Sequence, residues 1–198
     1  LLIHYQLPLL IVDDGSTRPV EELITKDPQL KLFSQTERLV IRRFKENQGK
    51  GAALQDAFLY GKTKGYTHII SVDGDGQHLP SEVELLIQAV HKKPFDLIIG
   101  CRKMDESAPG ISHFGRKFSN FWVNYQTNTD IKDSQSGLRA YPLFHMQNLT
   151  FKCKKYDFEI EVLIRCLWQG IGLTEVPVNV FYPPEQERVS HFDKLWDN

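Results

Sequence analysis

The sequence predicts an α/β protein with a Rossmann-like, mostly parallel sheet flanked by helices. Through the first hundred of the 198 residues, short apolar runs alternate with amphipathic segments. Two of these runs, 7–12 and 68–72, end directly in acidic, glycine-containing turns, as strands do at the carboxyl edge of a parallel sheet. Hydrophobic residues make up 41% of the chain, so one α/β domain with a substantial core is expected.

The expected elements follow in order. Aliphatic and β-branched runs predict strands at 8–12, 38–43, 67–72 and 96–100. Helices are predicted at 20–26, 50–64 and 81–92. The last helix has Pro80 at its entrance and Pro94 beyond its end, and an apolar face of Val83, Leu86, Ile87 and Val90. After Gly100 the alternation stops, and we expect the second half to build a different side of the molecule.

The segment 71–78 places two carboxylates, Asp73 and Asp75, two residues apart after a predicted strand. Gly74 and Gly76 let the backbone curl, so both carboxylates and the Gln77 amide can converge on one hard cation. Magnesium and manganese bind through few protein oxygens and leave positions for phosphate oxygens. The segment therefore predicts a metal site for a nucleotide-diphosphate substrate, although an ordinary Asp-Gly turn would have the same residues.

A second acidic turn follows the first predicted strand. Asp13 and Asp14 come directly after the apolar run and precede Gly15 and Ser16. Neighbouring parallel strands bring their carboxyl ends to one edge of the sheet, where ligands bind. We therefore expect the acidic residues of both turns to share one rim.

A glycine-flanked lysine lies between the two acidic turns. Gly49, Lys50 and Gly51 open a segment of helical spacing. A helix N-terminus presents free N–H groups, and Lys50 could add a full positive charge for a phosphate. The spacing is not that of a Walker loop, and a plain cap on a surface helix is the alternative.

Five segments of the chain carry motifs: 13–16, 47–51, 73–75, 133–139 and 158–161. In their order, these motifs resemble those of family 2 glycosyltransferases, most closely the branch of dolichol-phosphate mannosyltransferase and related polyprenyl-phosphate sugar transferases. The resemblance covers nearly the whole chain. It implies a GT-A fold with an acceptor-side second half, in a single domain over 1–198 that lacks the family's N-terminal strand and C-terminal end.

The resemblance also implies a reaction. It is the inverting transfer of a sugar from a UDP- or GDP-sugar to a lipid-linked acceptor, a polyprenyl phosphate, in cell-envelope or glycolipid biosynthesis. Residues assigned to the nucleotide-sugar donor are Asp13, Asp14, Gly15, Ser16, Asn47, Gly49, Lys50, Asp73 and Arg102. Residues assigned to a divalent cation, Mg or Mn, are Asp73, Asp75 and Gln77.

The acceptor side is assigned to the second half of the chain. The catalytic candidates are Asp133, Arg139, Arg188 and Glu159. Arg139 is expected to be available to an anionic group, and Glu159 is preferred over Glu161 for the active-site side. In the segment 188–192, His191 replaces a family lysine, so the way an acceptor phosphate is held stays open. A hydroxyl acceptor would need a base such as Asp133 or Glu159, whereas a phosphate already carries a nucleophilic oxygen and needs cations to position it.

A basic, aromatic segment, 112–122, predicts a helix with two possible roles. Arg116 and Lys117 lie beside Phe118, Phe121 and Trp122, and Tyr125 continues the helical spacing. The rings could rest at the headgroup depth of a membrane, with the cations near lipid phosphates. The alternative, which the sequence alone favours slightly, is a helix docked on its own domain.

Composition narrows the remaining functions. The net charge of −1 gives no support for nucleic-acid binding, which normally needs a strongly basic chain. The three cysteines are widely spaced, as in reduced thiols of a cytosolic protein, and no apolar run approaches the ~20 residues of a membrane span. We therefore expect a cytoplasmic protein, and peripheral association with the inner face of a membrane stays open as a further role. A sugar nucleotidyltransferase and a catalytically silent nucleotide-sugar-binding module are the alternative functions, and the oligomeric state stays open.

Overall fold

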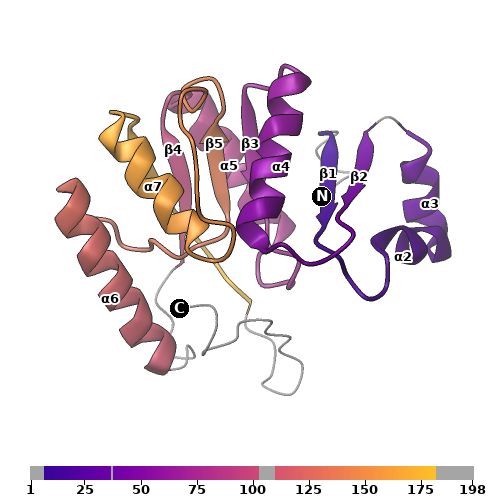
Figure 1. Ribbon diagram of the computed structural model, residues 1–198, viewed down its shortest axis with the longest axis horizontal. Coiled ribbons are helices and arrows are strands. Elements are labelled where there is room, and N and C mark those ends of the chain that lie inside the picture. The colour runs from indigo at the N-terminus through magenta and orange to yellow at the C-terminus, as the bar shows by residue number, and fades with distance from the viewer. Residues whose placement is uncertain (1–6, 37, 103–109, 182–198) are drawn as a thin grey trace.

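The computed structural model describes residues 7–36, 38–102 and 110–181, and the prediction of an α/β fold is confirmed (Figure 1). The described strands are β1 (Leu9–Asp13), β2 (Leu39–Arg43), β3 (His68–Ser71), β4 (Leu97–Arg102), β5 (Arg139–Pro142) and β6 (Leu173–Val178). The described helices are α2 (Val20–Lys26), α3 (Pro28–Ser34), α4 (Lys50–Thr63), α5 (Pro80–Lys92), α6 (Gly110–Thr127) and α7 (Phe158–Trp168). Every strand and helix expected before residue 102 is present.

The strands form two sheets. β1 and β2 pair in parallel, with Leu9 opposite Leu39. The second sheet has the order β3-β5-β4-β6, in which β4 and β6 are parallel and β5 runs antiparallel to both β3 and β4. The strands predicted at 8–12 and 67–72 therefore do not pair with one another, and an apolar cavity lies between them.

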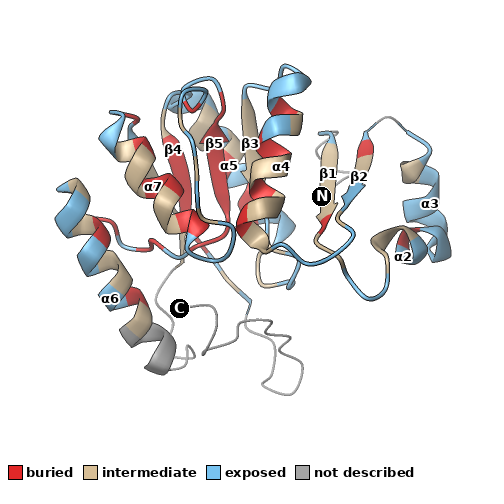
Figure 2. Cartoon of the chain, in the orientation of Figure 1, coloured by how far each residue is buried: buried red, intermediate tan, exposed pale blue. Residues whose placement is uncertain are grey.

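Helices cover both faces of the larger sheet, as Figures 1 and 2 show. Leu97 and Ile99 of β4 face one core cluster, which contains residues of α4 and α7. Ile98, between them, faces the second cluster with Val83 and Leu86 of α5. Successive strand side chains point to opposite faces, so this alternation places α5 on the face opposite α4 and α7.

One short helix, α3, was not expected from the sequence. Asp27 accepts hydrogen bonds from the amides of Gln29 and Leu30, and Pro28 is the first helical residue. This is a standard N-terminal signal, an acidic cap followed by proline, and it could have been identified from the sequence.

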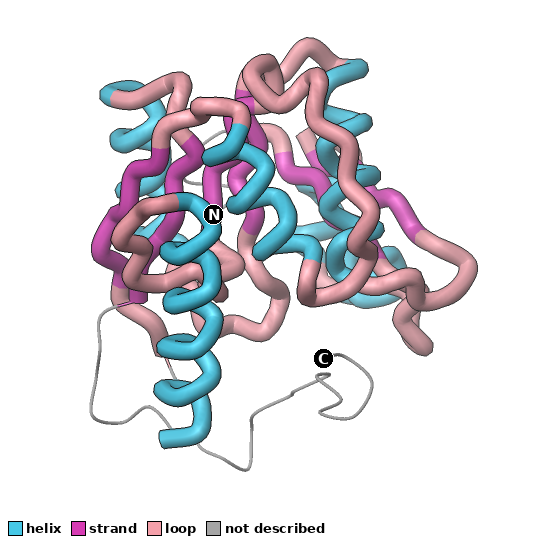
Figure 3. The backbone as a smooth tube through the Cα atoms, turned by 60° about the vertical axis from the view of Figure 1, so that its left-hand side comes forward, coloured by secondary structure: helices cyan, strands magenta, loops and turns pink. Residues whose placement is uncertain are grey.

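The long helix α6 lies at one side of the molecule, beside α7 (Figures 1 and 3). Its outer surface carries four exposed aromatic rings: Phe118, Phe121, Trp122 and Tyr125. In the described part of the chain, no helix is both long enough and apolar enough to cross a bilayer.

Candidate active site

The acidic turn after β1 is stabilised by hydrogen bonds to Asp13. The Asp13 carboxylate is buried and accepts hydrogen bonds from the amides of Ser16 (2.8 Å) and Val20 (3.2 Å). Burial alone would raise the pKa of Asp13, but the hydrogen bonds from Ser16 and Val20 and the nearby Arg43 guanidinium lower it. Asp13 therefore stays ionised and fixes the turn that leads into α2. Because its carboxylate is buried, it is not accessible to the nucleotide sugar that was expected to bind there.

Asp14 ties this turn to the start of α4. Its two carboxylate oxygens accept from the amides of Gln48 (2.7 Å) and Gly49 (2.8 Å). Gly15 has a φ of 73°, and a Cβ there would collide with the backbone of Glu46 and Asn47. The expected donor-binding segments 13–16 and 47–51 are thus brought together by backbone contacts that a side chain at Gly15 would prevent.

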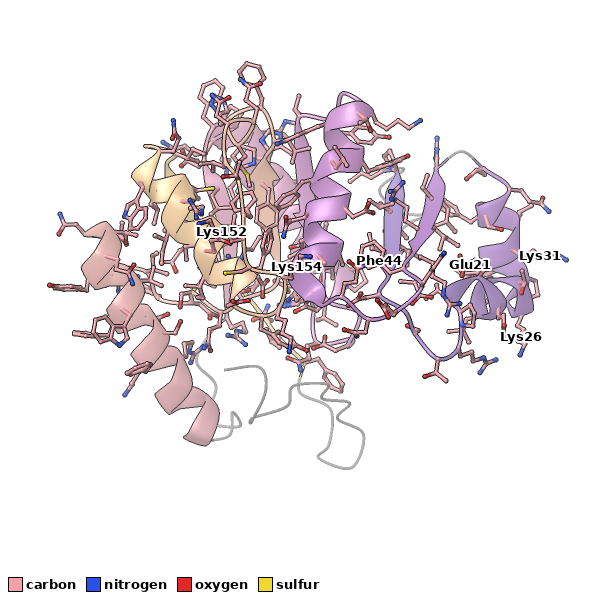
Figure 4. The ribbon with its side chains drawn as sticks, viewed as in Figure 1. Glu21, Lys26, Lys31, Phe44, Lys152 and Lys154 are labelled. Atoms are coloured by element: carbon pink, nitrogen blue, oxygen red, sulfur yellow. The ribbon has the colours of Figure 1, made fainter. Side chains whose placement is uncertain are left out.

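Glycines also let α4 approach the loop before α7. A Cβ on Gly49, where φ is 98°, would meet the carbonyl oxygen of Lys154, and a Cβ on Gly51 would meet Phe158. The Ala52 amide donates to the same Lys154 carbonyl at 3.0 Å. Figure 4 labels Lys154 beside the start of α4. The glycine-flanked lysine is therefore held in place by the second half of the chain.

Lys50, Asp73 and Glu159 form the charged centre of the site. The Lys50 Nζ lies 2.7 Å from Asp73 Oδ1 and 3.0 Å from Glu159 Oε2. Burial would lower the pKa of Lys50, but the carboxylates of Glu159 and Asp73 outweigh burial and raise it. Lys50 is therefore a permanent cation between residues expected on the donor and acceptor sides.

Glu159, and not Glu161, lies at this centre. The Oε1 atom of Glu159 is buried without a hydrogen-bond partner, whereas Oε2 contacts Lys50. Glu161 instead accepts from the amides of Lys152 and Cys153 (2.9 Å each) and pairs with Arg165. Burial would raise the pKa of Glu161, but these backbone and arginine hydrogen bonds lower it.

Gly137 lets the start of β5 lie against Asp73. A Cβ on Gly137 would overlap both oxygens of the Asp73 carboxylate. The Ser71 hydroxyl donates to the Gly137 carbonyl at 2.7 Å and fixes the same approach. Asp73 is therefore confined between the segment 133–139 and Lys50.

Asp75 and Gln77 carry oxygen atoms that suit a hard cation, but together with Asp73 they do not form a complete set of metal ligands. Asp75 is exposed, and its Oδ1 accepts from the Gln77 amide at 3.0 Å. A Cβ on Gly74 or Gly76 would meet nothing within 4 Å, so space remains around the turn. Among the described residues, no group of three or more His, Cys, Asp or Glu side chains could hold a metal. Two carboxylates and an amide do suit a cation that takes its other ligands from phosphate oxygens.

Asp133 and Arg102 neutralise one another, which was not predicted. Asp133 is 0% exposed, and its oxygens accept from Arg102 Nε and Nη2 at 2.7 Å each. The Arg102 amide donates to the same carboxylate at 3.1 Å. Asp133 is thus enclosed by donors and is not poised as a general base, while the Arg102 guanidinium, expected on the sugar side, faces Asp133.

The expectation that Arg139 is available to an anionic group is wrong. Arg139 begins β5, is 0% exposed and donates to the carbonyls of Ser134, Ser136 and Glu159 at 2.7 Å each. These bonds join the 133–139 segment to the first turn of α7. Arg139 therefore positions Glu159 and does not reach an acceptor.

Arg116 also differs from its expected place. It is buried, and its Nη1 lies 3.8 Å from Asp133 Oδ2, so it points into the domain and away from a lipid surface. Lys117 is exposed, as are Phe121 (62%) and Trp122 (45%). The helix is therefore docked through one face, as in the alternative that the sequence favours slightly, and it presents its rings outward on the other face.

His78, which was not among the expected site residues, lies beside the site. Its Nδ1 is buried without a hydrogen-bond partner. Burial lowers the pKa of His78, and Asp73, Asp75, Arg102 and Lys50 all lie near enough to influence it. Its position directly after Gln77, one of the expected metal ligands, could have identified it as a residue near the site.

Arg188 and His191, which were expected on the acceptor side, lie outside the described residues.

Comparisons with known proteins show which family the sequence matches. A family model described as "Glycosyl transferase family 2" matches residues 3–157. The polyprenol monophosphomannose synthase of Mycolicibacterium smegmatis is 28% identical over 190 residues, which cover 89% of this chain and 68% of that protein. The undecaprenyl-phosphate mannosyltransferase of Micrococcus luteus is 24% identical, over 86% of this chain and 70% of that protein.

A solved structure shares the fold. Glucosyl-3-phosphoglycerate synthase from Mycobacterium tuberculosis, in complex with Mn²⁺, UDP and glucosyl-3-phosphoglycerate, superposes with a TM-score of 0.64 at 16% identity. The match covers 91% of this chain and 63% of that one, so this chain spans less than two thirds of the length of the solved chain. The likeness confirms the GT-A fold predicted from the sequence.

Proposed function

The chain belongs to glycosyltransferase family 2, and on that premise we propose that it moves a sugar, with inversion, from a nucleoside-diphosphate sugar to a polyprenyl phosphate. The observation that carries the proposal is the cluster of Lys50, Asp73 and Glu159, with the exposed Asp75 beside it. It combines cation and carboxylates at the edge of the sheet where such folds bind nucleotides. The names of the two relatives support the acceptor.

The donor's diphosphate would be held by Lys50 together with a divalent cation on Asp73, Asp75 and Gln77. When bound, Mg or Mn neutralises the charge that develops on the leaving diphosphate. The Lys50 ammonium supplies a fixed charge beside that position. Asp14 holds the amides of Gln48 and Gly49, and so keeps the α4 N-terminus oriented toward the same place.

The state of the carboxylates favours a phosphate acceptor over a hydroxyl acceptor. A hydroxyl needs a base, but Asp133 is enclosed by Arg102, and one oxygen of Glu159 is paired with Lys50. A lipid phosphate has a second pKa near 6, so at neutral pH it already carries a nucleophilic oxygen. The enzyme then has to orient the phosphate and exclude water. Arg188 stays a proposed ligand for it.

The outward rings of α6 support peripheral binding at a membrane surface, which we place at the cytoplasmic face. Their ring centroids lie 6.2 Å apart for Phe118 and Trp122, 5.5 Å for Phe121 and Trp122, 6.5 Å for Phe121 and Tyr125, and 6.1 Å for Trp122 and Tyr125. Lys117 lies on the same exposed surface. Aromatic rings with an adjacent cation suit the headgroup region of anionic lipids.

A donor-binding experiment tests the metal-dependent part. Calorimetry of the chain with UDP and GDP, with and without Mn²⁺, should show binding that requires the metal. Asp75→Asn should weaken it at least tenfold, while the remote, exposed Asp130→Asn should not. Equal affinity in EDTA would refute a metal-dependent site.

Product analysis tests the acceptor. Radiolabelled sugar should appear on undecaprenyl phosphate and not on undecaprenol. Transfer to the alcohol would instead establish a hydroxyl acceptor. Formation of a nucleotide sugar from a sugar phosphate would identify a nucleotidyltransferase, and binding without turnover would identify a silent module.

A liposome experiment tests the membrane surface. Phe121→Ala with Trp122→Ala should reduce cosedimentation with anionic liposomes. Phe144→Ala, which removes an equally exposed ring (67%) elsewhere, should not. If the parent protein fails to sediment at low salt, the α6 rings serve another purpose.

A further inference from the structure

A buried acceptor and a buried donor near the charged centre both lack a hydrogen-bond partner among the described residues. The acceptor is the Oε1 atom of Glu159, whose Oε2 atom pairs with Lys50 at 3.0 Å. The donor is the hydroxyl of Tyr141, a residue that is 0% exposed. A carboxylate oxygen accepts and a phenol donates, so the two groups are complementary. Each costs free energy while it stays without a partner in the protein interior.

The sheet places Tyr141 beside the turn that carries Glu159. Tyr141 lies two residues after Arg139 on β5, so both side chains point to the same face of the sheet. The Arg139 Nη1 atom donates to the Glu159 carbonyl at 2.7 Å. The ring centroid of Phe58 in α4 lies 4.8 Å from that of Tyr141 and 6.0 Å from that of Phe158, the first residue of α7. Tyr141 therefore packs in one cluster with α4 and the start of α7, the two helices that Figure 1 shows on this face.

The Tyr141 hydroxyl keeps its proton at neutral pH. Burial raises the pKa of Tyr141 to about 12, and the Glu159 carboxylate adds to the rise. The cations of Lys50 and a neighbouring arginine act in the opposite direction and lower this pKa, as does the nearby Ser71 hydroxyl. Ser71 donates its own proton to the Gly137 carbonyl at 2.7 Å. The Tyr141 proton is therefore still free to be donated to an acceptor at the charged centre.

Donor binding would take the present partner away from Glu159. A diphosphate at the site competes with Asp73 and Glu159 for the Lys50 ammonium. The Glu159 side chain is only 7% exposed, so water replaces little of the interaction that Glu159 loses. The Tyr141 hydroxyl belongs to a side chain that is already fixed in the core, so it can serve Glu159 at a small cost in conformational entropy.

Building on the proposed function, we propose that Tyr141 is a positioning residue, whose hydroxyl donates to Glu159 Oε1 when the diphosphate of the nucleotide sugar draws the Lys50 ammonium away. The new hydrogen bond holds the Glu159 carboxylate in place and offsets part of the loss of Lys50. Tyr141 touches neither the nucleotide sugar nor the acceptor in this role, and it stays neutral throughout. Its influence on binding passes through Glu159.

A double-mutant cycle tests the hydroxyl without any ligand, because Lys50→Met imitates the departure of the ammonium. In the parent protein, Tyr141→Phe removes a hydroxyl that has no partner, so the thermal midpoint should change by less than about 1 °C. In the Lys50→Met background, the same substitution should lower the midpoint by about 3 °C or more, since the hydroxyl is then the donor to Glu159. Tyr125→Phe, which removes an exposed hydroxyl on α6, should change neither background.

Donor binding gives the second measurement. In calorimetry with UDP and Mn²⁺, the affinity of Tyr141→Phe should fall about tenfold below that of the parent, and Tyr125→Phe should bind as the parent does. Isotope-labelled tyrosine adds a spectroscopic signature. The NMR resonance of the Tyr141 Cζ atom, assigned by its loss in Tyr141→Phe, should shift when UDP and Mn²⁺ are added. It should shift in the same direction in Lys50→Met without ligand.

Three outcomes would overturn the proposal. Equal midpoint losses from Tyr141→Phe in the parent and in Lys50→Met would assign the hydroxyl to Ser71 and not to Glu159. An unchanged affinity of Tyr141→Phe, with a parent that binds UDP and Mn²⁺, would remove the role of Tyr141 and leave the proposed function intact. No binding by the parent would instead refute the proposed donor site, and with it the displacement of Lys50 on which the role of Tyr141 depends.

Discussion

Replacing Lys50 should destabilise the domain through Glu159. Lys50→Met removes the cation from a carboxylate whose side chain is 7% exposed. Breaking a buried ion pair by deleting one partner costs about 3–5 kcal/mol, since a buried charge loses its partner. The Lys50 and Asp73 side chains retain 21% and 31% exposure, so water screens part of this cost. We therefore expect a loss of about 2 kcal/mol in the free energy of unfolding.

Thermal unfolding followed by calorimetry measures this loss. For a chain of this length 1 kcal/mol corresponds to about 2–4 °C, so the midpoint should fall by about 4–8 °C. Glu159→Gln removes the charge that Lys50 neutralises, and the double variant should therefore lose less than the sum of the two single variants, with a coupling of about 1 kcal/mol. Lys31→Met, on the exposed surface of α3, should leave the midpoint unchanged. Additive effects of the two site variants within about 0.5 kcal/mol would refute the pairing.

Three further predictions concern Glu161, Gly137 and Arg139. The pKa of folded Glu161 lies below its ordinary value of 4.5, so its contribution is full above pH 4.5 and is lost as the pH falls through the folded pKa. Glu161→Gln should accordingly lower the melting temperature more at pH 7 than at pH 2, and an equal loss at both would contradict this. Gly137→Ala should displace the Asp73 carboxylate and weaken Mn²⁺-dependent UDP binding about tenfold in calorimetry, while Gly115→Ala, with open space around it, should not. Arg139→Lys should cost about 2–4 kcal/mol in urea unfolding, since an ammonium cannot reach all three carbonyls; a loss below 1 kcal/mol would show that they find other partners.

The first hundred residues could be predicted well because local signals and the fold agree there. The acidic turn at Asp13 and the glycines at Gly15 and Gly49 determine short-range geometry, and the structure uses each in the expected segment. Periodicity placed α4 and α5 within one or two residues. The order of the strands in the sheets could not be predicted from periodicity. The pattern within a strand shows that it is buried, but it does not show which other strands it pairs with.

The errors in the second half have a common physical cause. Asp133 and Arg139 look like free charges in a glycine-containing loop, but Arg139 is buried as the first residue of β5, between β3 and β4, and Asp133 is buried against Arg102 and Arg116. A buried arginine must use its donors, and three carbonyls within hydrogen-bonding reach satisfy them. The sequence shows the charge of such a residue but not whether its partner is a substrate or its own backbone.

The charged residues of the site fall into two groups, those that pair within the protein and those that keep part of their side chain exposed. Arg102 neutralises Asp133, and Arg139 secures the first turn of α7. Under the proposed function, both would act behind the surface that faces the nucleotide sugar. Lys50 is different, because it bridges Asp73 and Glu159 while keeping part of its side chain exposed. A diphosphate that draws the Lys50 ammonium toward itself would leave Asp73 free for a metal cation. That cation would replace the positive charge that Lys50 had supplied to Asp73. Under the proposed function, donor and metal should therefore bind cooperatively, each removing a cost that the other would otherwise face alone.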